Sequence, residues 1–402
     1  MPLPSCRIVL EIQRRRELTS TVAIVRCRDY SKSNVSTAIR EAVDLLGGIE
    51  NFVQPANRVL LKPNLLSPRK PEASITTHPA VIEVIAELIH EVGAKSFIGD
   101  SPASTSDSAE AYRNLLNITG MLGAAANSGA ETVRFDDSGV VHSVSEAIIF
   151  RNILLSGELD AADVLINVPK LKTHELTRIT GAVKNLFGCV PGRRKVEFHL
   201  QAGTDSEQFA QILVDILREV RPAISIMDAV IGMEGQGPAA GQLRDIGLII
   251  ASADPVALDA VVCMIIGLDP FAVPTLKLAH EQGVGIASPE QISVVGTPIE
   301  QVRIADFKLP PRCDALSRVP KPIYKLLRNQ FTRSPHFIRE KCSGCKACAE
   351  ICPVKAISGK GTKLKIDYSK CIRCYCCQEI CPNKAISLHT GWLRRRFNKL
   401  LD

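Results

Sequence analysis

The most constraining feature of this 402-residue chain is a cysteine pattern that occurs twice near the C-terminus. Each copy has the spacing C-x2-C-x2-C-x3-C-P, and the copies begin at Cys342 and Cys371. Three thiolates at this close interval fit three corners of a cubane [4Fe-4S] cluster, and the fourth corner needs a sulfur from elsewhere. The repeated spacing therefore predicts two [4Fe-4S] clusters within one small interlocked domain.

Zinc and disulfide bonds account for the pattern less well. Zinc sites use pairs of cysteines and need neither a third cysteine at the same interval nor a proline after a fourth. A disulfide framework suits a small secreted domain, not cysteines compressed into about 40 residues of a much longer chain. Iron-sulfur clusters remain the interpretation that explains the whole motif.

The similarity between the two copies extends beyond the cysteines. Cys352-Pro-Val-Lys-Ala-Ile-Ser and Cys381-Pro-Asn-Lys-Ala-Ile-Ser differ at one position, which indicates an internal duplication of a strand, a cluster loop and a short helix. Residues 336–390 thus resemble the bacterial-type two-cluster ferredoxin family, in which the last cysteine of each run ligates the other cluster. The resemblance implies low-potential one-electron transfer. It also implies one ligand set of Cys342, Cys345, Cys348 and Cys381 and a second set of Cys371, Cys374, Cys377 and Cys352.

Two further cysteines lie in informative places outside this pattern. Cys376 precedes Cys377, and we interpret it as an inert neighbour, with an alternative-ligand or redox role left open. Cys189 lies in a glycine-rich segment, and we interpret it as a buried thiol, with redox or ligand duty as the alternative.

Positive charge is concentrated at the C-terminus. Residues 311–402 hold 20 Lys and Arg but only 6 Asp and Glu, a local charge of +14, whereas the remainder carries −7. Two oxidised clusters would offset about 4 of these positive charges. The rest fits attraction of a redox partner protein, which we expect to be acidic. No nucleic acid partner is expected, because the basic residues lack the interleaved aromatic side chains of stacking platforms.

No hydrophobic segment has the length of a membrane span or the position of a leader. The sequence contains no run of about 18 apolar residues, and no apolar stretch follows Arg14, Arg15 and Arg16 as a signal peptide would require. We therefore expect no transmembrane segment and a cytoplasmic location.

Between residues 21 and 306, short apolar runs alternate with longer helical patterns. The expected strands cover 21–26, 58–62, 96–99, 163–168, 223–228, 246–251 and 291–295, and the expected helices cover 35–46, 79–92, 207–220 and 254–266. This alternation predicts a doubly wound α/β domain with a mainly parallel sheet, carrying an inserted lobe around residues 101–160. An irregular arm (1–20), a linker (307–335), the small α+β ferredoxin-like domain (336–390) and a basic tail (391–402) complete the expected organisation.

Polar residues cluster where the predicted strands end, which is where open parallel sheets bind ligands. Many cations and few carboxylates lie among glycines between Asn167 and His199, and ammonium groups bind carboxylate or phosphate. We expect a small anionic ligand here. The candidate binding residues are Lys62, Asn64, Asp100, Asn167, Lys170, Lys172, Lys184, Asn185 and Lys195. His174 and His199 are candidate catalytic residues, because imidazoles move protons near neutral pH.

Five sequence segments between residues 61 and 238 resemble motifs of the family labelled domain of unknown function 362. They are Leu61-Lys-Pro-Asn-Leu65, Gly99-Asp-Ser-Pro102, Asn167-Val-Pro-Lys-Leu-Lys-Thr-His174, Gly181-Ala-Val-Lys-Asn-Leu-Phe-Gly-Cys-Val-Pro-Gly192 and Met233-Glu-Gly-Gln-Gly-Pro238. Members of that family often carry a C-terminal ferredoxin module, and the resemblance implies an iron-sulfur protein. The family label assigns no reaction.

Two functions fit these features. The first is an oxidoreductase in which two [4Fe-4S] clusters pass electrons to or from a small anionic substrate or cofactor in the α/β domain. The second is a non-enzymatic electron carrier or iron-sulfur scaffold whose α/β domain docks a partner protein or a metal cofactor.

Overall fold

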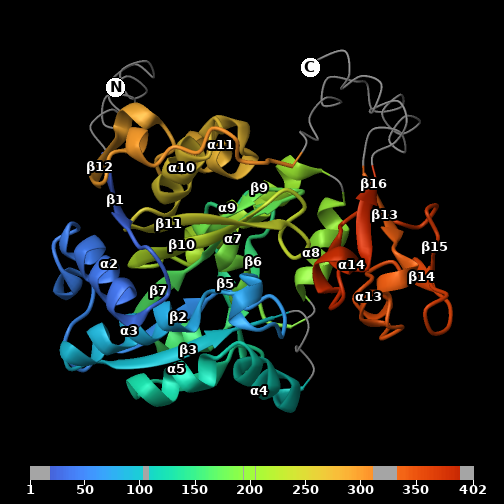
Figure 1. Ribbon diagram of the computed structural model, residues 1–402, viewed down its shortest axis with the longest axis horizontal. Helices are drawn as coiled ribbons and strands as arrows, with labels where there is room; N and C mark the ends of the chain where they lie inside the picture. Colours follow the sequence, from blue (N-terminus) through green and yellow to red (C-terminus); the bar gives the residue numbers. More distant parts are fainter. Residues whose placement is uncertain (1–18, 103–107, 193, 204, 311–332, 390–402) are drawn as a thin grey trace, which may run out of the picture.

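The computed structural model describes residues 19–102, 108–192, 194–203, 205–310 and 333–389 (Figure 1). Most of the predicted arm, the central part of the linker and the basic tail lie outside these residues. The described chain forms a large α/β part and a small C-terminal part that lie side by side. The predicted fold class is confirmed.

A mixed, mainly parallel sheet runs through the α/β part. Its strands follow the order β12-β1-β11-β10-β7-β2-β3-β4, and β8 adds to β10 and pairs with β9. Their bounds are β1 Ser20–Arg26, β2 Arg58–Pro63, β3 Lys95–Asp100, β4 Glu131–Arg134, β7 Val164–Val168, β8 Lys170–His174, β9 Arg178–Thr180, β10 Ile224–Glu234, β11 Gln242–Ser252 and β12 Ile292–Gly296. Strands β2, β3, β4, β7 and β10 are parallel neighbours, whereas β11 is antiparallel to both β1 and β10.

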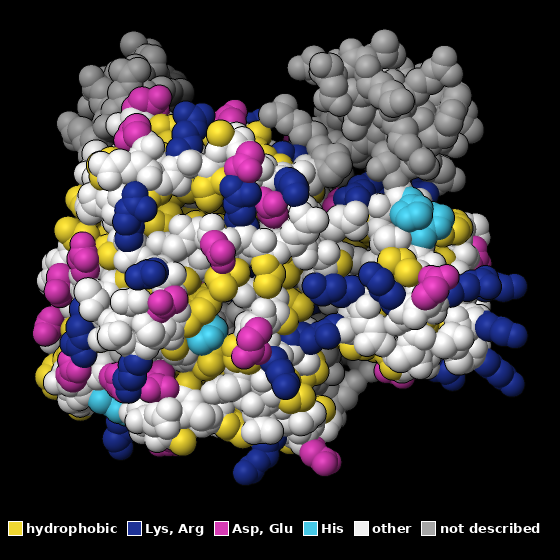
Figure 2. Space-filling model, in the orientation of Figure 1, with side chains coloured by type: hydrophobic (Ala, Val, Ile, Leu, Met, Phe, Trp, Pro, Cys, Tyr) yellow, Lys and Arg dark blue, Asp and Glu magenta, His cyan; other side chains and the backbone are white. Residues whose placement is uncertain are grey.

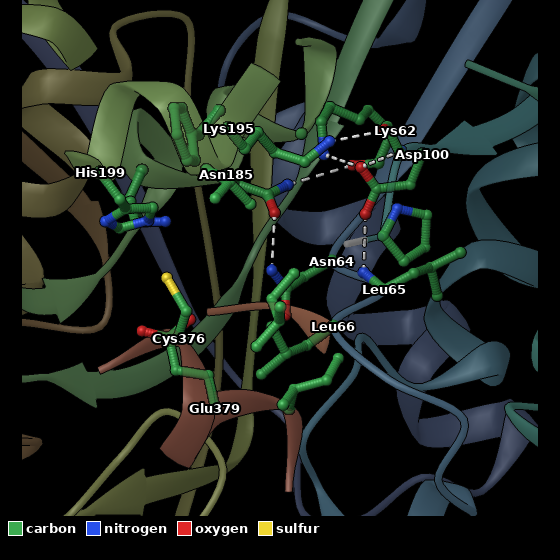
Figure 3. Close-up of a pocket in the computed structure, with 18 residues that line it drawn as sticks. Lys62, Asn64, Leu65, Leu66, Asp100, Asn185, Lys195, His199, Cys376 and Glu379 are labelled. Carbon is green, nitrogen blue, oxygen red and sulfur yellow. Dashed lines mark hydrogen bonds and ion pairs between the residues drawn. The ribbon is translucent and has the colours of Figure 1, made fainter. Parts of the chain in front are cut away.

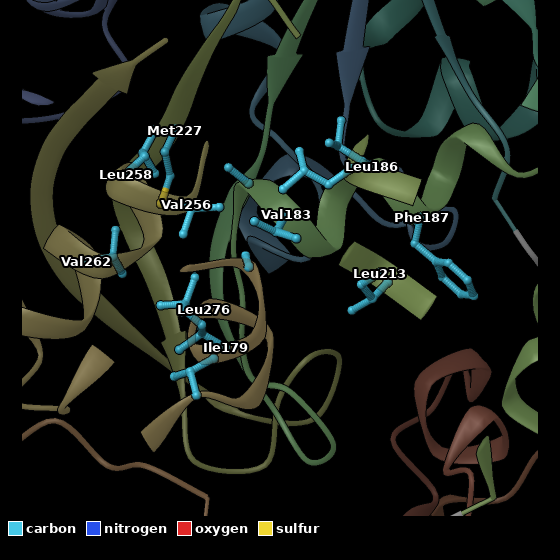
Figure 4. Packing of buried hydrophobic residues seen from close by; sticks show 14 of the residues in the cluster. Ile179, Val183, Leu186, Phe187, Leu213, Met227, Val256, Leu258, Val262 and Leu276 are labelled. Atoms are coloured by element: carbon cyan, nitrogen blue, oxygen red, sulfur yellow. The ribbon is translucent and has the colours of Figure 1, made fainter. Parts of the chain in front are cut away.

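Two hydrophobic cores lie on opposite faces of this sheet. Successive strand side chains point to opposite faces, so in β1 Val22 and Ile24 enter one core while Ala23 and Val25 enter the other. Helices α2 (Lys32–Asp44), α3 (Pro79–Glu91), α4 (Ala109–Ile118) and α5 (Met121–Ser128) cover one face. Helices α7 (Ala182–Asn185), α8 (Arg194–Ala202), α9 (Ser206–Glu219), α10 (Pro255–Ile265) and α11 (Pro274–Glu281) pack around the other core (Figure 4).

Capping residues fix several helix starts as the sequence predicts. Helix α3 begins at Pro79, where a missing N–H costs no helical hydrogen bond, and the His78 ring accepts a hydrogen bond from Ala80 N. Asp254 caps α10 by accepting hydrogen bonds from Val256 N and Ala257 N. These contacts explain why the predicted helices begin within a few residues of the observed ones.

Two regions differ from the expectation. Within the predicted lobe around residues 101–160, β4 pairs with β3 and extends the main sheet, while the hairpin of β5 (Gly139–Ser143) and β6 (Asn152–Ser156) forms a separate sheet. The linker assignment is too long at both ends: Phe307 is buried in the α/β core, and β13 (Ser334–Phe337) begins before residue 336.

The C-terminal part contains the two copies of the duplication. Strand β13 pairs with β16 (Ile386–His389), and β14 (Ile357–Ser358) pairs with β15 (Lys365–Ile366). Each cluster motif leads into a short helix, α13 (Ala347–Glu350) or α14 (Cys376–Ile380). Helix α14 faces α8 of the large part (Figure 1), and Gln378 Nε2 donates a 3.2 Å hydrogen bond to Gln236 O across the junction.

No helix within the described ranges combines the length and the apolar character needed to cross a membrane.

Candidate functional site

The eight motif cysteines surround two separate cavities in the C-terminal part. Cys342, Cys345, Cys348 and Cys381 line one cavity, and Cys352, Cys371, Cys374 and Cys377 line the other. These groupings equal the two ligand sets implied by the ferredoxin resemblance, including the exchange of the fourth cysteine. Among the described residues no three His, Cys, Asp or Glu side chains converge closely enough to hold a single metal ion. Each set of four thiols instead surrounds a wider cavity.

The backbone around both cavities adopts the same unusual conformation. Lys346 and Tyr375 occupy equivalent positions after the second cysteine and have φ of 63° and 64°. Such left-handed geometry costs a non-glycine residue about 1–2 kcal/mol, and strain of this kind clusters at functional sites. In addition, Ala356 N and Ala385 N each donate a 3.2 Å hydrogen bond to the fourth cysteine sulfur of their motif. The residues therefore fit two sulfur-ligated clusters.

A third cavity lies at the junction between the two parts (Figure 3) and has a volume of about 100 Å³. This volume leaves room for several water-sized groups. Its walls come from both parts of the chain: Lys62, Asn64, Leu65, Leu66, Asp100, Ser101, Pro102, Lys184, Asn185, Phe187, Gly188, Lys195, Val196 and His199 from the α/β part, and Ile351, Cys376, Glu379 and Ile380 from the C-terminal part.

The neighbouring parallel strands β2 and β3 carry the two residues of an ion pair that lines this junction cavity. Lys62 is the next-to-last residue of β2 and Asp100 ends β3, and the Lys62 ammonium lies 2.7 Å from the Asp100 carboxylate. Asp100 also accepts a 2.8 Å hydrogen bond from Leu65 N. A Cβ at position 188 would overlap both side chains of the pair, so glycine is required there for the segment to pass over them.

Two other lysines reach the junction cavity without a carboxylate partner. Among the described residues no Asp or Glu oxygen lies within 4 Å of the ammonium of Lys184 or Lys195. Lys184 Nζ instead lies 4.6 Å from the centroid of the Phe187 ring, a cation–π contact. Lys195 Nζ donates hydrogen bonds to Ser101 Oγ and Val190 O. Burial lowers the pKa of both lysines, that of Lys195 to about 8.

The two candidate histidines have different surroundings. His199 lines the junction cavity, and its buried Nδ1 has no hydrogen-bond partner among the described residues. Burial lowers the pKa of His199 to about 3, so its ring is neutral near pH 7. His174 lies behind the cavity wall. Its Nδ1 accepts hydrogen bonds from Leu176 N and Thr177 N, and its Nε2 lies 3.1 Å from Glu379 Oε1. The protein therefore engages Nδ1 of His174 through hydrogen bonds, and Nε2 contacts the Glu379 carboxylate without forming one.

Three of the candidate binding residues lie outside the cavity lining, because other protein groups hold them. Lys170 Nζ lies 2.9 Å from the Asp228 carboxylate and is fully buried. Lys172 Nζ donates 2.7 Å hydrogen bonds to Asn64 Oδ1 and Ile75 O. Asn167 donates to Ala182 O. These residues brace the strands that carry the cavity wall, whereas Lys62, Asn64, Asp100, Lys184, Asn185 and Lys195 line it.

Sequence reasoning misses the contribution of helix α14. Cys376, interpreted from sequence as an inert neighbour, lines the junction cavity together with Glu379. The duplication contains one signal for this role, because the equivalent position in the first copy is Ala347. Cys189 is fully buried outside the cavity lining, as expected of a structural thiol.

Comparisons with known proteins agree with this architecture. A family model described as "Domain of unknown function (DUF362)" matches residues 59–264, and one described as "4Fe-4S dicluster domain" matches residues 341–385. The chain belongs to the DUF362 family and is an iron-sulfur protein with its iron-sulfur domain at the C-terminus. Both resemblances drawn from the sequence motifs are confirmed.

One curated protein is similar in sequence to most of the chain. The chain is 36% identical over 322 residues to "Thylakoid-associated protein sll1697" from Synechocystis sp., which covers 79% of this chain and 98% of that protein. Among solved structures, the lactate racemase apoprotein from Thermoanaerobacterium thermosaccharolyticum matches with a TM-score of 0.40 and 10% identity. That match covers 66% of this chain and 59% of the racemase chain.

Proposed function

We propose that this protein transfers single electrons between an acidic redox partner protein and a small anionic ligand bound in the junction cavity. The observation that carries the proposal is the shared wall of that cavity. Lysines of the α/β part face residues of α14, and α14 begins between two cysteines of the second cavity set. A ligand in this position would contact both parts of the chain.

The eight motif cysteines would hold the redox centres. Cys342, Cys345, Cys348 and Cys381 would ligate one [4Fe-4S] cluster, and Cys352, Cys371, Cys374 and Cys377 would ligate a second. When bound, such clusters take up and release single electrons at low potential. Cys376 and Cys377 are consecutive residues of α14, so the second set adjoins the cavity wall directly.

The polar groups of the junction cavity favour an anion. Lys62 is paired with Asp100 and Glu379 with His174, whereas no Asp or Glu oxygen of the described residues lies within 4 Å of the ammonium of Lys184 or Lys195. An unpaired buried charge costs several kcal/mol, and a bound oxyanion would remove that cost. Apolar side chains of Leu65, Phe187 and Ile380 form much of the remaining wall. A small carboxylate with a short apolar body matches this lining.

The exposed face of the C-terminal part suits an acidic protein partner. Cys345 is exposed, and Lys341 and Lys346 are exposed in the same loop. Figure 2 shows Lys and Arg side chains projecting along the outer side of this part. Complementary charge raises the association rate and makes it depend on ionic strength.

Native mass spectrometry of the full-length protein, purified without oxygen, tests the cavity assignment. We expect the wild type to retain a small anion that the Lys184→Met variant loses, while Lys365→Met, an exposed lysine of the C-terminal part, retains it. Stopped-flow reduction by an acidic flavodoxin tests the partner assignment. The rate should fall with added salt and in the Lys341→Glu/Lys346→Glu variant. An anion retained equally by all three proteins would contradict the cavity assignment.

A further inference from the structure

A chain of three polar side chains leads away from the junction cavity. Lys195, buried on α8, donates a 2.5 Å hydrogen bond from Nζ to Ser101 Oγ and a 2.6 Å hydrogen bond to Val190 O. The Ser101 hydroxyl in turn donates a 2.5 Å hydrogen bond to Asp136 Oδ1. Asp136 follows β4, and its Oδ1 also accepts a 2.6 Å hydrogen bond from Gly192 N, whereas its buried Oδ2 has no hydrogen-bond partner among the described residues.

The nitrogen of Lys195 has one position left for a ligand. Two of its N–H groups are used by Ser101 and Val190, and Lys195 is one of the residues that line the cavity. An ammonium would direct its third N–H to the ligand, whereas a neutral amine would direct its lone pair there. Lys195 can therefore give a proton to the ligand and take one back without losing either hydrogen bond to the protein.

We infer that Lys195 is the acid–base group of the junction cavity, and that Ser101 and Asp136 hold it in place and stabilise its charge. This inference rests on the proposed function, in which the redox partner protein supplies electrons to the bound anion. A ligand that has gained an electron forms a bond to the Lys195 proton as the N–H bond breaks, leaving a neutral amine. The neutral amine regains its proton from solvent when the product leaves the cavity, while Ser101 and Val190 keep its two other N–H groups in place.

The electrostatic surroundings favour Lys195 over His199 and His174 as the acid–base group. Burial is the main cause that lowers the pKa of Lys195 to about 8. Asp136 and Asp100 favour its ammonium form, as does any charge on Cys189, whereas Lys62 opposes it. Lys195 therefore carries a proton near pH 7 and can still release it. His199 is already neutral there, because burial lowers its pKa to about 3.

Reductive trapping with glyoxylate tests this inference on the full-length protein with its clusters in place. Glyoxylate carries a carboxylate and an aldehyde, so with cyanoborohydride it should bind in the cavity and alkylate a neutral amine. Peptide mass spectrometry between pH 6 and 10 should give a labelling midpoint of about 8 for Lys195, against about 10.4 for an exposed lysine such as Lys365. At pH 7 Lys195 should react at least about tenfold faster than Lys365.

Two comparisons complete the test. Uncharged acetaldehyde should lose the preference for Lys195, and Asp136→Asn should lower the labelling midpoint because it removes a charge that stabilises the ammonium. Preferential labelling of Lys184 but not Lys195 would overturn the acid–base assignment and leave the anion cavity standing. A Lys195 midpoint near that of Lys365, or one unchanged by Asp136→Asn, would also overturn it. If glyoxylate labels neither cavity lysine faster than Lys365, the anion cavity itself is refuted.

Discussion

His174 Nε2 and Glu379 Oε1 lie 3.1 Å apart and join the two parts of the chain through a mostly buried pair. His174 belongs to β8 of the central sheet, and Glu379 belongs to α14 of the C-terminal part. Burial alone would raise the pKa of Glu379, but the close contact with His174 and the charge of Lys184 lower it to about 2. The pair thus holds an ionised carboxylate beside the junction cavity and aligns the two domains.

Breaking this pair should destabilise the folded protein. Removing one partner of a buried polar pair leaves the other unsatisfied, at a cost of about 1–3 kcal/mol. We expect His174→Ala and Glu379→Gln each to lower the free energy of unfolding by about that amount, with a coupling of at least about 1 kcal/mol in the double-mutant cycle. Urea unfolding followed by circular dichroism measures both values. The exposed pair of Lys277 and Glu281, at 3.9 Å, serves as the control and should show coupling below about 0.5 kcal/mol.

The cysteine sets predict distinct effects of single substitutions on iron content. Cys345→Ala removes a member of one set, so iron should fall from about eight to about four atoms per chain with loss of one cluster. Cys376→Ala lies outside both sets and should retain all the iron. Iron and sulfide analysis of protein purified without oxygen, together with EPR spectra, decides between these outcomes. Equal iron loss in both variants would contradict the ligand sets.

Stability should rise with pH because of Lys172. Burial lowers its pKa to about 7 in the folded protein, whereas the unfolded chain keeps the ordinary value of about 10.4. Between these values the unfolded chain binds the extra proton, so raising the pH favours the folded state. From pH 7 to pH 9 the free energy of unfolding of the wild type should gain about 2 kcal/mol relative to Lys172→Met. Urea unfolding at several pH values measures the change. The difference between the wild type and Lys277→Met, an exposed substitution, should show no such trend, because that variant keeps Lys172.

Gly188, which lies against the ion pair of Lys62 and Asp100, should not tolerate a methyl group. A Cβ at Gly188 would overlap the side chains of Asp100 and Lys62. We expect Gly188→Ala to destabilise the protein by about 2 kcal/mol or more, because the pair must separate while both partners stay buried. Gly123→Ala is the matched control, because nothing lies within 4 Å of its added Cβ in helix α5. That change should be neutral or stabilise by up to about 1 kcal/mol. Thermal unfolding of both variants provides the comparison.

Local patterns were sufficient to predict much of the fold. Short apolar runs of consecutive residues predict β1, β2 and β3. Pro79 and Asp254 mark the starts of helices through the backbone geometry and hydrogen bonds of the first helical turn. The grouping of the cysteines follows from the motif and its duplication. In each case the determining interactions lie close together in the chain, which is why a single sequence contains them.

The remaining features depend on contacts between distant residues. The predicted strand ends at residue 168 and no strand is predicted where β8 forms; Lys170 and Lys172 are poor candidates for a buried strand. They are buried because Asp228 and Asn64, far away in the sequence, satisfy them. The difference between Cys376 and Ala347 marks an unusual position in the duplication, but the cavity wall that Cys376 contributes arises only when α14 docks against the α/β part.

The claim that an anion binds beside the redox domain is tested most directly by ¹⁹F relaxation of trifluoroacetate. Reduced clusters are paramagnetic and would shorten the relaxation time of a fluorine nucleus bound in the junction cavity. Our account predicts that reduced full-length protein enhances the relaxation of trifluoroacetate well beyond that of uncharged trifluoroethanol, and that Lys184→Met removes most of the difference. Equal enhancement of the two probes, or a difference unchanged by Lys184→Met, would contradict it.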